Sequence, residues 1–477
     1  MDVDVLIVGG GVSGLSAAWW LAQRGVAAEL WERAPTLGGV VGTRRVGGYA
    51  MESGASLMLN FRPEVTAFIE QSGLAPEKLA LRSDAPRFVV QRGMLAQVPT
   101  RLGSQAFTPF WSGCGRLRLL AEPLIPRGGD EAETASAFVT RRLGCEALEK
   151  VFEPMLASTF GCDPDLAQAR AVLPRLTALE QRFGSIAVGV LVRKLRRQAA
   201  PAMEMFSFKG GMQSLIDALA RNPGVSVRTE CTAAVLVREP DGWAALACTR
   251  EGERRLRARH VVLSVPAMEA AELLDPNDPE LAALIGGLEY APLAVVHLGF
   301  ERAAIEHRLD GMGFLVPRAE ARALLGCQWS AGVLAERAPG GRVLLSAFLG
   351  GARAPQIAQW DEAAIAGAAL DQLTALLGLR DAPETTQVVR HTRGLPLYHG
   401  NHLRRVRDVR ERLRRWPGLH IAANYLDGVS TRDRIVSGYA VAGEICSQLL
   451  AASGGRRPER EHVRPVPRRR EARGATI

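Results

Sequence analysis

Three glycines near the start of the chain stand at the spacing that a dinucleotide cofactor requires. Gly9, Gly11 and Gly14 form a Gly-x-Gly-x-x-Gly pattern. The first allows a tight turn, the second lets a pyrophosphate approach the backbone, and the third lets a helix pack closely on a strand. Glu32 follows eighteen residues after Gly14. A carboxylate there can accept hydrogen bonds from both ribose hydroxyls of an adenosine and would repel the 2′-phosphate of NADP.

The flanking sequence predicts the elements that must position these residues. We expect a short buried strand over 3–8, a helix from Gly11 onward, and a second strand that ends at Glu32. The helix N-terminus would then offer free N–H groups to the phosphates. A similar unit recurs near the other end, where we expect a strand over 419–422, a turn at Gly428 and a helix over 429–450.

Composition limits the classes of protein to which the chain can belong. A length of 477 residues predicts two or three domains, and an apolar fraction of 47% supports a large core. The seven cysteines are scattered without a Cys-x-x-Cys pair, which argues against a disulfide framework or a zinc site and fits a reducing compartment. The eight histidines show no metal-binding spacing, so we expect no metal. We also expect neither a signal peptide nor a membrane-spanning run.

The net charge of +9 is concentrated at the C-terminal end. Residues 456–473 hold eight arginines against three glutamates, and with their prolines they predict a disordered arm over 453–477. Such an arm can contact anionic lipid or nucleic acid. We favour a solvated arm without a partner and expect no nucleic-acid binding.

Two further glycine-containing segments resemble motifs of the amine-oxidase-like flavoproteins. They are "LGGVVGT" over 37–43 and "ESGASLML" over 52–59, and in that superfamily such segments lay backbone against FAD. Four longer stretches resemble the oxygen-dependent protoporphyrinogen oxidases and their close relatives, the coproporphyrinogen III oxidases. These stretches are 37–59, 152–189, 393–406 and 422–439.

The resemblance implies a fold and a domain plan. The expected fold class is α/β, with a discontinuous Rossmann-like FAD-binding domain, a mixed α+β substrate domain and a helical membrane-associated subdomain. The FAD-binding domain would comprise 1–76, 203–265 and 405–452, the substrate-binding domain 77–94 and 266–404, and the helical subdomain 95–202.

The resemblance also implies a reaction and its participants. Protoporphyrinogen IX would be oxidised to protoporphyrin IX by removal of six electrons in three flavin cycles, with dioxygen converted to hydrogen peroxide. FAD would be bound non-covalently, because the loop over 424–431 offers no cysteine for attachment. The protein would lie on the cytoplasmic face of a membrane as a peripheral protein, and a homodimer is left open.

The cofactor residues carried over by position comprise the first motif, the two glycine segments, the C-terminal loop and isolated contacts. They are Gly9, Gly10, Gly11, Val12, Ser13, Gly14, Glu32, Arg33, Gly39, Val40, Gly54, Ala55, Ser56, Leu57, Val235, His391, Ala423, Gly428, Val429 and Ser430. The helix that begins near Val429 would aim its N-terminus at the flavin O2.

The substrate would be a broad apolar macrocycle with propionate groups at its rim. Arg87 stands where the family pairs an arginine with a propionate, and a guanidinium binds carboxylate bidentately. The pocket positions are Cys162, Met312, Gly313, Leu315, Leu334 and Phe348. A backbone carbonyl near Gly161 would meet the pyrrole N–H groups. No acid–base residue is proposed, so the catalytic group is the flavin itself.

Apolar and basic residues are interleaved over 102–128, which is typical of a segment that lies on a membrane surface. The apolar members include Phe107, Phe110, Trp111, Leu117, Leu119, Leu120, Leu124 and Ile125, and the basic ones are Arg101, Arg116, Arg118 and Arg127. The alternative interpretation is a core helix pair with solvated arginines.

Three other functions stay open at this point. Coproporphyrinogen III is the alternative substrate, and its two additional carboxylates would need extra cations around the pocket. Another FAD-dependent oxidase or desaturase of the same fold is a second alternative. A flavin-binding protein without turnover is the third.

Overall fold

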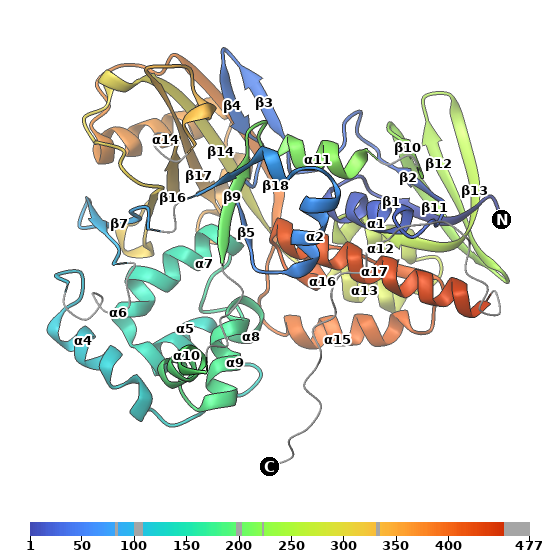
Figure 1. Cartoon of the computed structure of the whole chain (residues 1–477), viewed down its shortest axis with the longest axis horizontal. Helices are drawn as coiled ribbons and strands as arrows, with labels where there is room; N and C mark the ends of the chain where they lie inside the picture. The colour runs from blue at the N-terminus through green and yellow to red at the C-terminus, as the bar shows by residue number, and fades with distance from the viewer. Residues whose placement is uncertain (82–83, 100–107, 197–202, 222–223, 331–333, 453–477) are drawn as a thin grey trace.

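Two large β-sheets and a lobe of helices make up the computed structural model of this chain (Figure 1). The structure describes residues 1–81, 84–99, 108–196, 203–221, 224–330 and 334–452. The basic arm predicted over 453–477 and the start of the predicted membrane segment, 101–107, lie outside the described residues.

The first sheet has seven strands in the order β10-β2-β1-β13-β12-β11, with β19 paired to β13. They are β1 (Val3–Val8), β2 (Ala28–Trp31), β10 (Val225–Arg228), β11 (Cys231–Glu239), β12 (Gly242–Thr249), β13 (Gly252–Leu263) and β19 (Leu419–Ile421). β10, β2, β1, β19 and the end of β13 run parallel, whereas β11, β12 and the start of β13 form an antiparallel meander. The strand predicted over 3–8 is confirmed, and β2 ends so that Glu32 follows it directly.

Helices cover both faces of this sheet, because side chains of β1 alternate between two cores: Val5 and Ile7 face one core, and Leu6 and Val8 face the other. One face carries α1 (Val12–Ala22), α2 (Pro63–Gln71), α11 (Gln213–Ala220) and α17 (Thr431–Ala452), and the other carries α12 (Ala267–Leu274), α13 (Pro279–Gly286), α15 (His402–Leu413) and the single-turn α16 (Asn424–Asp427).

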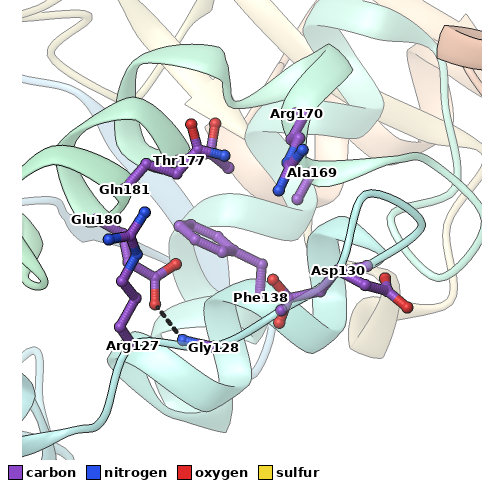
Figure 2. Close-up of a pocket in the computed structure, with 11 residues that line it drawn as sticks. Arg127, Gly128, Asp130, Phe138, Ala169, Arg170, Thr177, Glu180 and Gln181 are labelled. Carbon is purple, nitrogen blue, oxygen red and sulfur yellow. Dashed lines mark hydrogen bonds between the residues drawn. The ribbon is translucent and has the colours of Figure 1, made fainter.

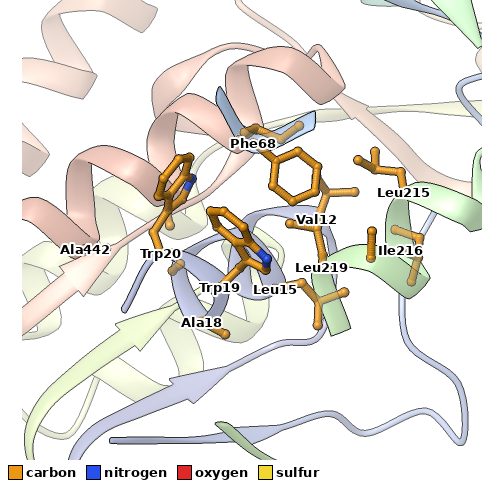
Figure 3. Close-up of a cluster of buried hydrophobic side chains, with 14 of the residues drawn as sticks. Val12, Leu15, Ala18, Trp19, Trp20, Phe68, Leu215, Ile216, Leu219 and Ala442 are labelled. Carbon is orange, nitrogen blue, oxygen red and sulfur yellow. The ribbon is translucent and has the colours of Figure 1, made fainter. Parts of the chain in front are cut away.

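Large aromatic side chains fix α1 against its neighbours (Figure 3). Trp19 packs edge-on against Phe68 of α2, with ring centroids 5.0 Å apart, and Trp20 packs edge-on against Tyr439 of α17 at 4.8 Å. Gly438 allows α17 to approach α1 closely, since a Cβ there would lie 2.5 Å from Ser16 Oγ. The N-terminal and C-terminal segments therefore form one unit, as the discontinuous arrangement predicts.

Helix α17 is the one described segment whose length and composition would allow it to span a membrane, which differs from the expectation of no such run. Its side chains Ile435, Val441, Ala442 and Ile445 are buried against α1 and the first sheet. Core helices pass the same test of length and composition, and this face of α17 packs as part of the core.

Residues 267–288, which the predicted boundary assigns to the substrate domain, pack against the first sheet. Ala267, Ala270, Leu274, Leu281 and Ile285 share one core with β1, β12 and β13. The predicted boundary follows the end of β13, because no sequence signal indicated that the next two helices, α12 and α13, pack back onto the first sheet.

Asp278 ties α13 to the end of α15. Its carboxylate accepts hydrogen bonds from Arg412 Nε at 2.7 Å, Trp416 Nε1 at 2.8 Å and the Leu281 N–H at 3.0 Å. Burial pushes the pKa of Asp278 upward, but the Arg412, Leu281 and Trp416 hydrogen bonds dominate and bring it to about 2.

We expect this carboxylate to stabilise the folded protein by about 2 kcal/mol above its unfolded pKa, because the folded pKa is the lower one. That stabilisation is lost as the pH falls through the folded pKa, between about pH 4 and pH 2. Over this pH range, the free energy of unfolding measured in urea should fall less for the Asp278→Asn variant than for the parent chain. Equal losses in the two proteins would contradict the assignment.

The second sheet also has seven strands, in the order β18-β14-β17-β16-β15-β7-β8. They are β7 (Phe88–Gln91), β8 (Met94–Gln97), β14 (Tyr290–Glu301), β15 (Gly313–Leu315), β16 (Leu324–Trp329), β17 (Arg342–Gly350) and β18 (Thr385–Pro396). All neighbours are antiparallel except β7 and β15. Helix α14 (Glu362–Leu377) covers one face of the sheet and leaves the other face for the site.

Two small sheets connect the large ones. β3 (Thr43–Val46) pairs with β4 (Tyr49–Glu52). β9 (Glu204–Phe208) lies between β5 (Met58–Asn60) and β6 (Lys78–Ala80). These strands carry the chain from the first sheet toward the second.

The described helices between β8 and β9 form a separate lobe, which we call the helical lobe (residues 108–196; Figure 1). They are α4 (Gly113–Leu120), α5 (Ala135–Leu143), α6 (Cys145–Ala147), α7 (Glu153–Phe160), α8 (Ala169–Val172), α9 (Pro174–Phe183) and α10 (Ile186–Leu195). The α/β fold class with added mixed and helical parts is confirmed.

Part of the predicted membrane segment is built into the helical lobe instead of facing outward. Phe110 and Trp111 are buried in its core. Arg116 donates to the carbonyls of Thr108 and Trp111, and Arg118 donates to those at the end of α5. The alternation of apolar and basic residues did not distinguish these core positions from surface ones, because burial depends on α5 and α6 packing over them.

Candidate FAD and substrate site

The glycine-rich loop joins β1 to α1 in a conformation that requires glycine at positions 9 and 14. Gly9 has φ +106°, in the left-handed region that favours glycine. A Cβ on Gly14 would lie 2.0 Å from the Gly9 carbonyl oxygen, whereas no atom lies within 4 Å of the Cβ position at Gly11. Gly14 therefore packs directly against the backbone of the loop, whereas the space beside Gly11 is empty.

Helix α1 begins at this loop without any internal cap. Gly11 is its N-cap and makes no side-chain cap hydrogen bond, and the first turn contains no acidic residue. Val12, Ser13 and Gly14 are nevertheless buried. Uncapped N–H groups at a buried helix N-terminus fit the pyrophosphate of a dinucleotide.

Glu32 directs its carboxylate into the same loop. Oε2 accepts the Gly10 N–H at 2.6 Å, and Oε1 accepts the Ala34 N–H at 2.8 Å. Each oxygen keeps a lone pair for a further donor. The carboxylate is therefore held in place where two vicinal hydroxyls could bind it.

We expect Glu32→Ala to weaken FAD binding by roughly a hundredfold, because about 3 kcal/mol of charge-assisted hydrogen bonding is lost. Glu32→Gln keeps one acceptor oxygen, so its FAD affinity should lie between that of the parent chain and that of Glu32→Ala. Titration of each apoprotein with FAD, followed by quenching of flavin fluorescence, measures the effect. The melting temperatures of the apoproteins serve as the control, since Glu32 also binds two backbone groups. Unchanged affinity in Glu32→Ala would rule out its ribose role.

The second glycine pair lies directly against the first motif. Gly38 N donates to the Gly10 carbonyl at 2.9 Å, and a Cβ on Gly39 would lie 3.4 Å from the Gly11 Cα. Gly54 sits close to Val40, whose carbonyl oxygen would be 2.5 Å from a Cβ. The structure thus brings three of the predicted cofactor segments together.

The segment with Ala55, Ser56 and Leu57 is held between the two large sheets. Ser56 Oγ donates to Gln328 Oε1 of β16 at 2.6 Å. His391 of β18 donates from Nε2 to the Ser53 carbonyl at 2.6 Å. His391 therefore reaches the predicted cofactor loop, and Gln328 joins it, although no sequence pattern had pointed to Gln328.

A buried histidine fixes the start of the same loop. His297 Nε2 donates to the Glu52 carbonyl at 2.9 Å, so its Nδ1 accepts from Ser346 Oγ at 2.9 Å. Burial lowers the pKa of His297 to about 4, which keeps this tautomer neutral. The start of the loop is thus anchored to β14 of the second sheet by the hydrogen bond from His297.

The C-terminal loop of the predicted flavin site runs from Ala423 to Ser430. Ala423 is buried and caps α16, and Gly428 has φ +102°. Ser430 Oγ donates to Asp433 Oδ2 at 2.6 Å. Tyr398 donates to the Asn424 carbonyl of this loop. Val429 and Ser430 directly precede α17, so the predicted helix N-terminus is present, although the helix begins at Thr431 and not at Val429. The short helix α16 before it was not predicted.

Three predicted cofactor residues have exposed side chains. Val40 and Val235 are large exposed hydrophobic side chains. Arg33 follows Glu32 and forms an exposed ion pair with Glu269 at 3.2 Å. Their roles toward FAD stay predictions.

The face of the second sheet opposite α14 carries two of the predicted substrate residues, Leu315 and Phe348. Phe314 and Ala347 point into the core beneath α14, so their strand neighbours Leu315 and Phe348 point to the opposite face. Gln328 and Ser346 share that face and bond to the Ser56 side chain and to His297. The predicted macrocycle residues thus face the predicted flavin loop.

Arg87 precedes β7 at the far end of this sheet. Its side chain is exposed, and no ion pair to it is found among the described residues. The Met312 N–H donates to the neighbouring Pro86 carbonyl at 2.9 Å, and β15 pairs with β7. The structure therefore brings Arg87, Met312, Gly313 and Leu315 together, as a cation beside an apolar strand.

Two predicted contacts are buried. Cys162 is 2% exposed, and its thiol donates to the Leu156 carbonyl in the helical lobe; burial raises its pKa to about 12. Leu334 is buried as well, but it lines a small cavity together with Ser56, Gln328 and Ser346. The Gly161 carbonyl accepts the Ala352 N–H at 2.7 Å, which leaves one lone pair for a pyrrole N–H.

A polar cavity of about 280 Å³ lies inside the helical lobe, away from these loops (Figure 2). Its walls come from α5, α8, α9 and the preceding loop, and its carboxylates Glu133 and Glu180 are bound by Arg141. These polar walls do not fit an apolar macrocycle, so the uncovered sheet face is the better candidate.

Comparison with known proteins agrees with this arrangement. A family model described as flavin containing amine oxidoreductase matches residues 12–446. A mitochondrial protoporphyrinogen oxidase of Nicotiana tabacum is 27% identical, over 94% of this chain and 96% of its own length. The coproporphyrinogen III oxidase of Propionibacterium freudenreichii subsp. freudenreichii is 28% identical, over 94% and 92%.

Solved structures share the fold. A protein from Exiguobacterium sp. 255-15, titled "Putative protoporphyrinogen oxidase", superposes with a TM-score of 0.78 at 24% identity and covers 94% of this chain and 99% of its own. A reduced UDP-galactopyranose mutase superposes with a TM-score of 0.71 at 13% identity, over 94% and 96%. At these identities the structural likeness shows the fold alone.

Proposed function

We propose that this chain, which belongs to the flavin-containing amine oxidoreductase family, oxidises a porphyrinogen to the corresponding porphyrin. The family and the relatives named protoporphyrinogen oxidase make the chain a FAD-dependent oxidoreductase. One observation carries the substrate proposal. An exposed arginine, with no ion pair among the described residues, stands at the end of a sheet face lined by Leu315 and Phe348, and that face meets the expected flavin loops.

FAD, when bound, supplies a two-electron acceptor that dioxygen can reoxidise, so three cycles complete a porphyrin. The chain's own residues bind and orient the substrate. Arg87 would hold a propionate, and the sheet face would carry the macrocycle. The free lone pair of the Gly161 carbonyl would accept a pyrrole N–H. The helical lobe would exclude water from the opposite side.

Two porphyrinogens are candidates, and the relatives are named for both. Protoporphyrinogen IX needs one charged rim and an otherwise apolar pocket, which Arg87 and the sheet face offer. Coproporphyrinogen III carries additional propionates and needs cations on a second side.

Aerobic turnover of the FAD-loaded protein on each porphyrinogen tests the proposal, with porphyrin fluorescence and hydrogen peroxide followed together. Arg87→Ala should raise the KM by roughly tenfold, because one charge-assisted contact at an exposed site is lost. Arg92→Ala is a suitable control, since Arg92 lies exposed beyond β7. Absence of porphyrin from both substrates, with FAD bound, would overturn the proposal.

We also propose a peripheral membrane contact through the helical lobe. Leu117, Leu120 and Leu124 are 69%, 65% and 83% exposed, and Leu191 and Leu195 of α10 are exposed as well. Large exposed leucines of this kind can insert at a bilayer interface. Flotation with liposomes should be lost when Leu117, Leu120 and Leu124 are replaced by serine, and retained flotation would contradict the proposal.

A further inference from the structure

Two arginines, Arg175 and Arg432, lie over the ring of Phe61, and the guanidinium groups of Arg62 and Arg193 act electrostatically on Arg175. Arg62 precedes α2, Arg175 lies in α9, Arg193 lies in α10 and Arg432 lies in the first turn of α17. We call these four residues and Phe61 the Phe61 cluster. Its members come from four separate parts of the chain, so no local sequence pattern predicts it.

Two of the guanidinium groups stack on the phenyl ring. The Cζ of Arg175 lies 3.3 Å from the ring centroid of Phe61, and the Cζ of Arg432 lies 4.1 Å from it. Both distances are within the range of a cation–π contact, so the ring of Phe61 holds two guanidinium groups at once. Arg432 Nη1 also donates to the Leu59 carbonyl at 3.0 Å, which fixes its position.

The cluster has more cations than carboxylates. Asp433 pairs with Arg432 at 2.9 Å, and Glu64 pairs with Arg62 at 3.4 Å. Over the described part of the chain, no ion pair to Arg175 or Arg193 is found. Burial and the guanidinium groups of Arg432, Arg193 and Arg62 lower the pKa of Arg175. Asp433 offsets part of this repulsion of Arg175, and a bound anion would relieve the remainder.

The Phe61 cluster adjoins the flavin end of the expected cofactor site. The predicted cofactor loop over 54–57 reaches Phe61 four residues later, and Arg432 comes two residues after Ser430. Asp433, which pairs with Arg432, also accepts the Ser430 hydroxyl. Arg87 belongs to the other end of the site, beside the penultimate strand of the second sheet.

We propose that the Phe61 cluster is a second carboxylate subsite of the substrate pocket, suited to a porphyrinogen with propionates on all four pyrroles. The inference rests on the proposed function and deepens it. A macrocycle held at one rim by Arg87 would present its opposite rim to the cluster. That rim carries vinyl groups in protoporphyrinogen IX and propionates in coproporphyrinogen III. Guanidinium groups that are always charged and planar bind such carboxylates bidentately.

The Arg175→Gln variant of the FAD-loaded protein tests the subsite. The KM for coproporphyrinogen III should rise roughly 10- to 100-fold, since a charged hydrogen bond is lost, while the KM for protoporphyrinogen IX should change less than about twofold. Arg175→Lys keeps the charge and should restore part of the loss. Arg182→Gln, on the exposed surface of the same helix, is the matched control and should change neither constant.

A purely structural role for Arg175 predicts a different pattern. A structural role would lower the melting temperature, and the two KM values would change equally or not at all. Either of these two KM patterns overturns the subsite. If Arg175→Gln does not fold, Arg193→Gln reads the same subsite without removing a group stacked on Phe61. Fluorescence titration with coproporphyrin and protoporphyrin needs no turnover. A selective loss of coproporphyrin affinity supports the subsite even where oxidation fails, and failure of oxidation alone counts against the proposed function.

Discussion

Gly11→Ala should leave the folded apoprotein intact and abolish tight FAD binding, whereas Gly14→Ala should damage the fold itself. Gly11 has φ −73° and ψ 177°, which alanine adopts without strain, and its Cβ position is empty to 4 Å. The empty space is where a pyrophosphate must approach the backbone. A methyl group there should weaken FAD binding by at least about a hundredfold, or about 3 kcal/mol.

The partner variant separates folding from binding. At Gly14 the new Cβ would stand 2.0 Å from the Gly9 carbonyl oxygen, so α1 must move away from β1. Such overpacking costs roughly 1–3 kcal/mol, and cofactor binding is lost as a consequence. Melting temperatures of the two apoproteins and FAD titrations of both distinguish the mechanisms. Parental FAD affinity in Gly11→Ala would contradict the cofactor site.

Removing either partner of the Glu122–Arg142 pair should destabilise the helical lobe by about 3–5 kcal/mol, because an uncompensated charge is left buried. Glu122 is 1% exposed and Arg142 is 0% exposed. The Glu122 carboxylate also accepts the Ser185 hydroxyl at 2.6 Å and the N–H groups of Ile186 and Ala187 at the start of α10. Burial alone would raise the pKa of Glu122, but these hydrogen bonds and that of Arg142 lower it.

The matched control is an ion pair on the surface. Arg407 and Glu131 are 57% and 44% exposed at the side chain, and Arg407→Ala should have little effect on stability because solvent screens the pair. Limited proteolysis in increasing urea reports opening of the lobe without assuming that the whole chain unfolds in one step. Glu122→Gln and Arg142→Met should both open earlier than the parent. If they open no earlier than Arg407→Ala, the buried pair does not hold the lobe together.

The cofactor half of the site could be predicted because its signals are local. A strand, a glycine turn and a helix lie within twenty residues, and the strand over 3–8 and the helix that ends at Ala22 fold as expected. The helix predicted near the C-terminus is also present, and its side chains Ile435, Ala442 and Ile445 are buried. The turn of α16 was missed because four residues carry too little periodicity to signal a helix.

The substrate half could not be predicted to the same depth, because its residues meet only through tertiary packing. Gln328 and Ser56 are far apart in the sequence, and so are Arg175 and Arg432. The burial of Phe110 and Trp111 likewise depends on helices that follow them. A motif position placed Arg87 at a rim, but no motif could show which other arginines share its pocket.

Anaerobic mixing of the FAD-loaded protein with a porphyrinogen tests the central claim most directly. If the chain oxidises porphyrinogens, the yellow flavin absorbance should bleach as porphyrin fluorescence rises, and admission of air should restore the absorbance with formation of hydrogen peroxide. The flavin of Arg87→Ala should bleach more slowly at low substrate concentration. A flavin that stays oxidised in the presence of both porphyrinogens would contradict the account and leave this chain with the fold and the cofactor alone.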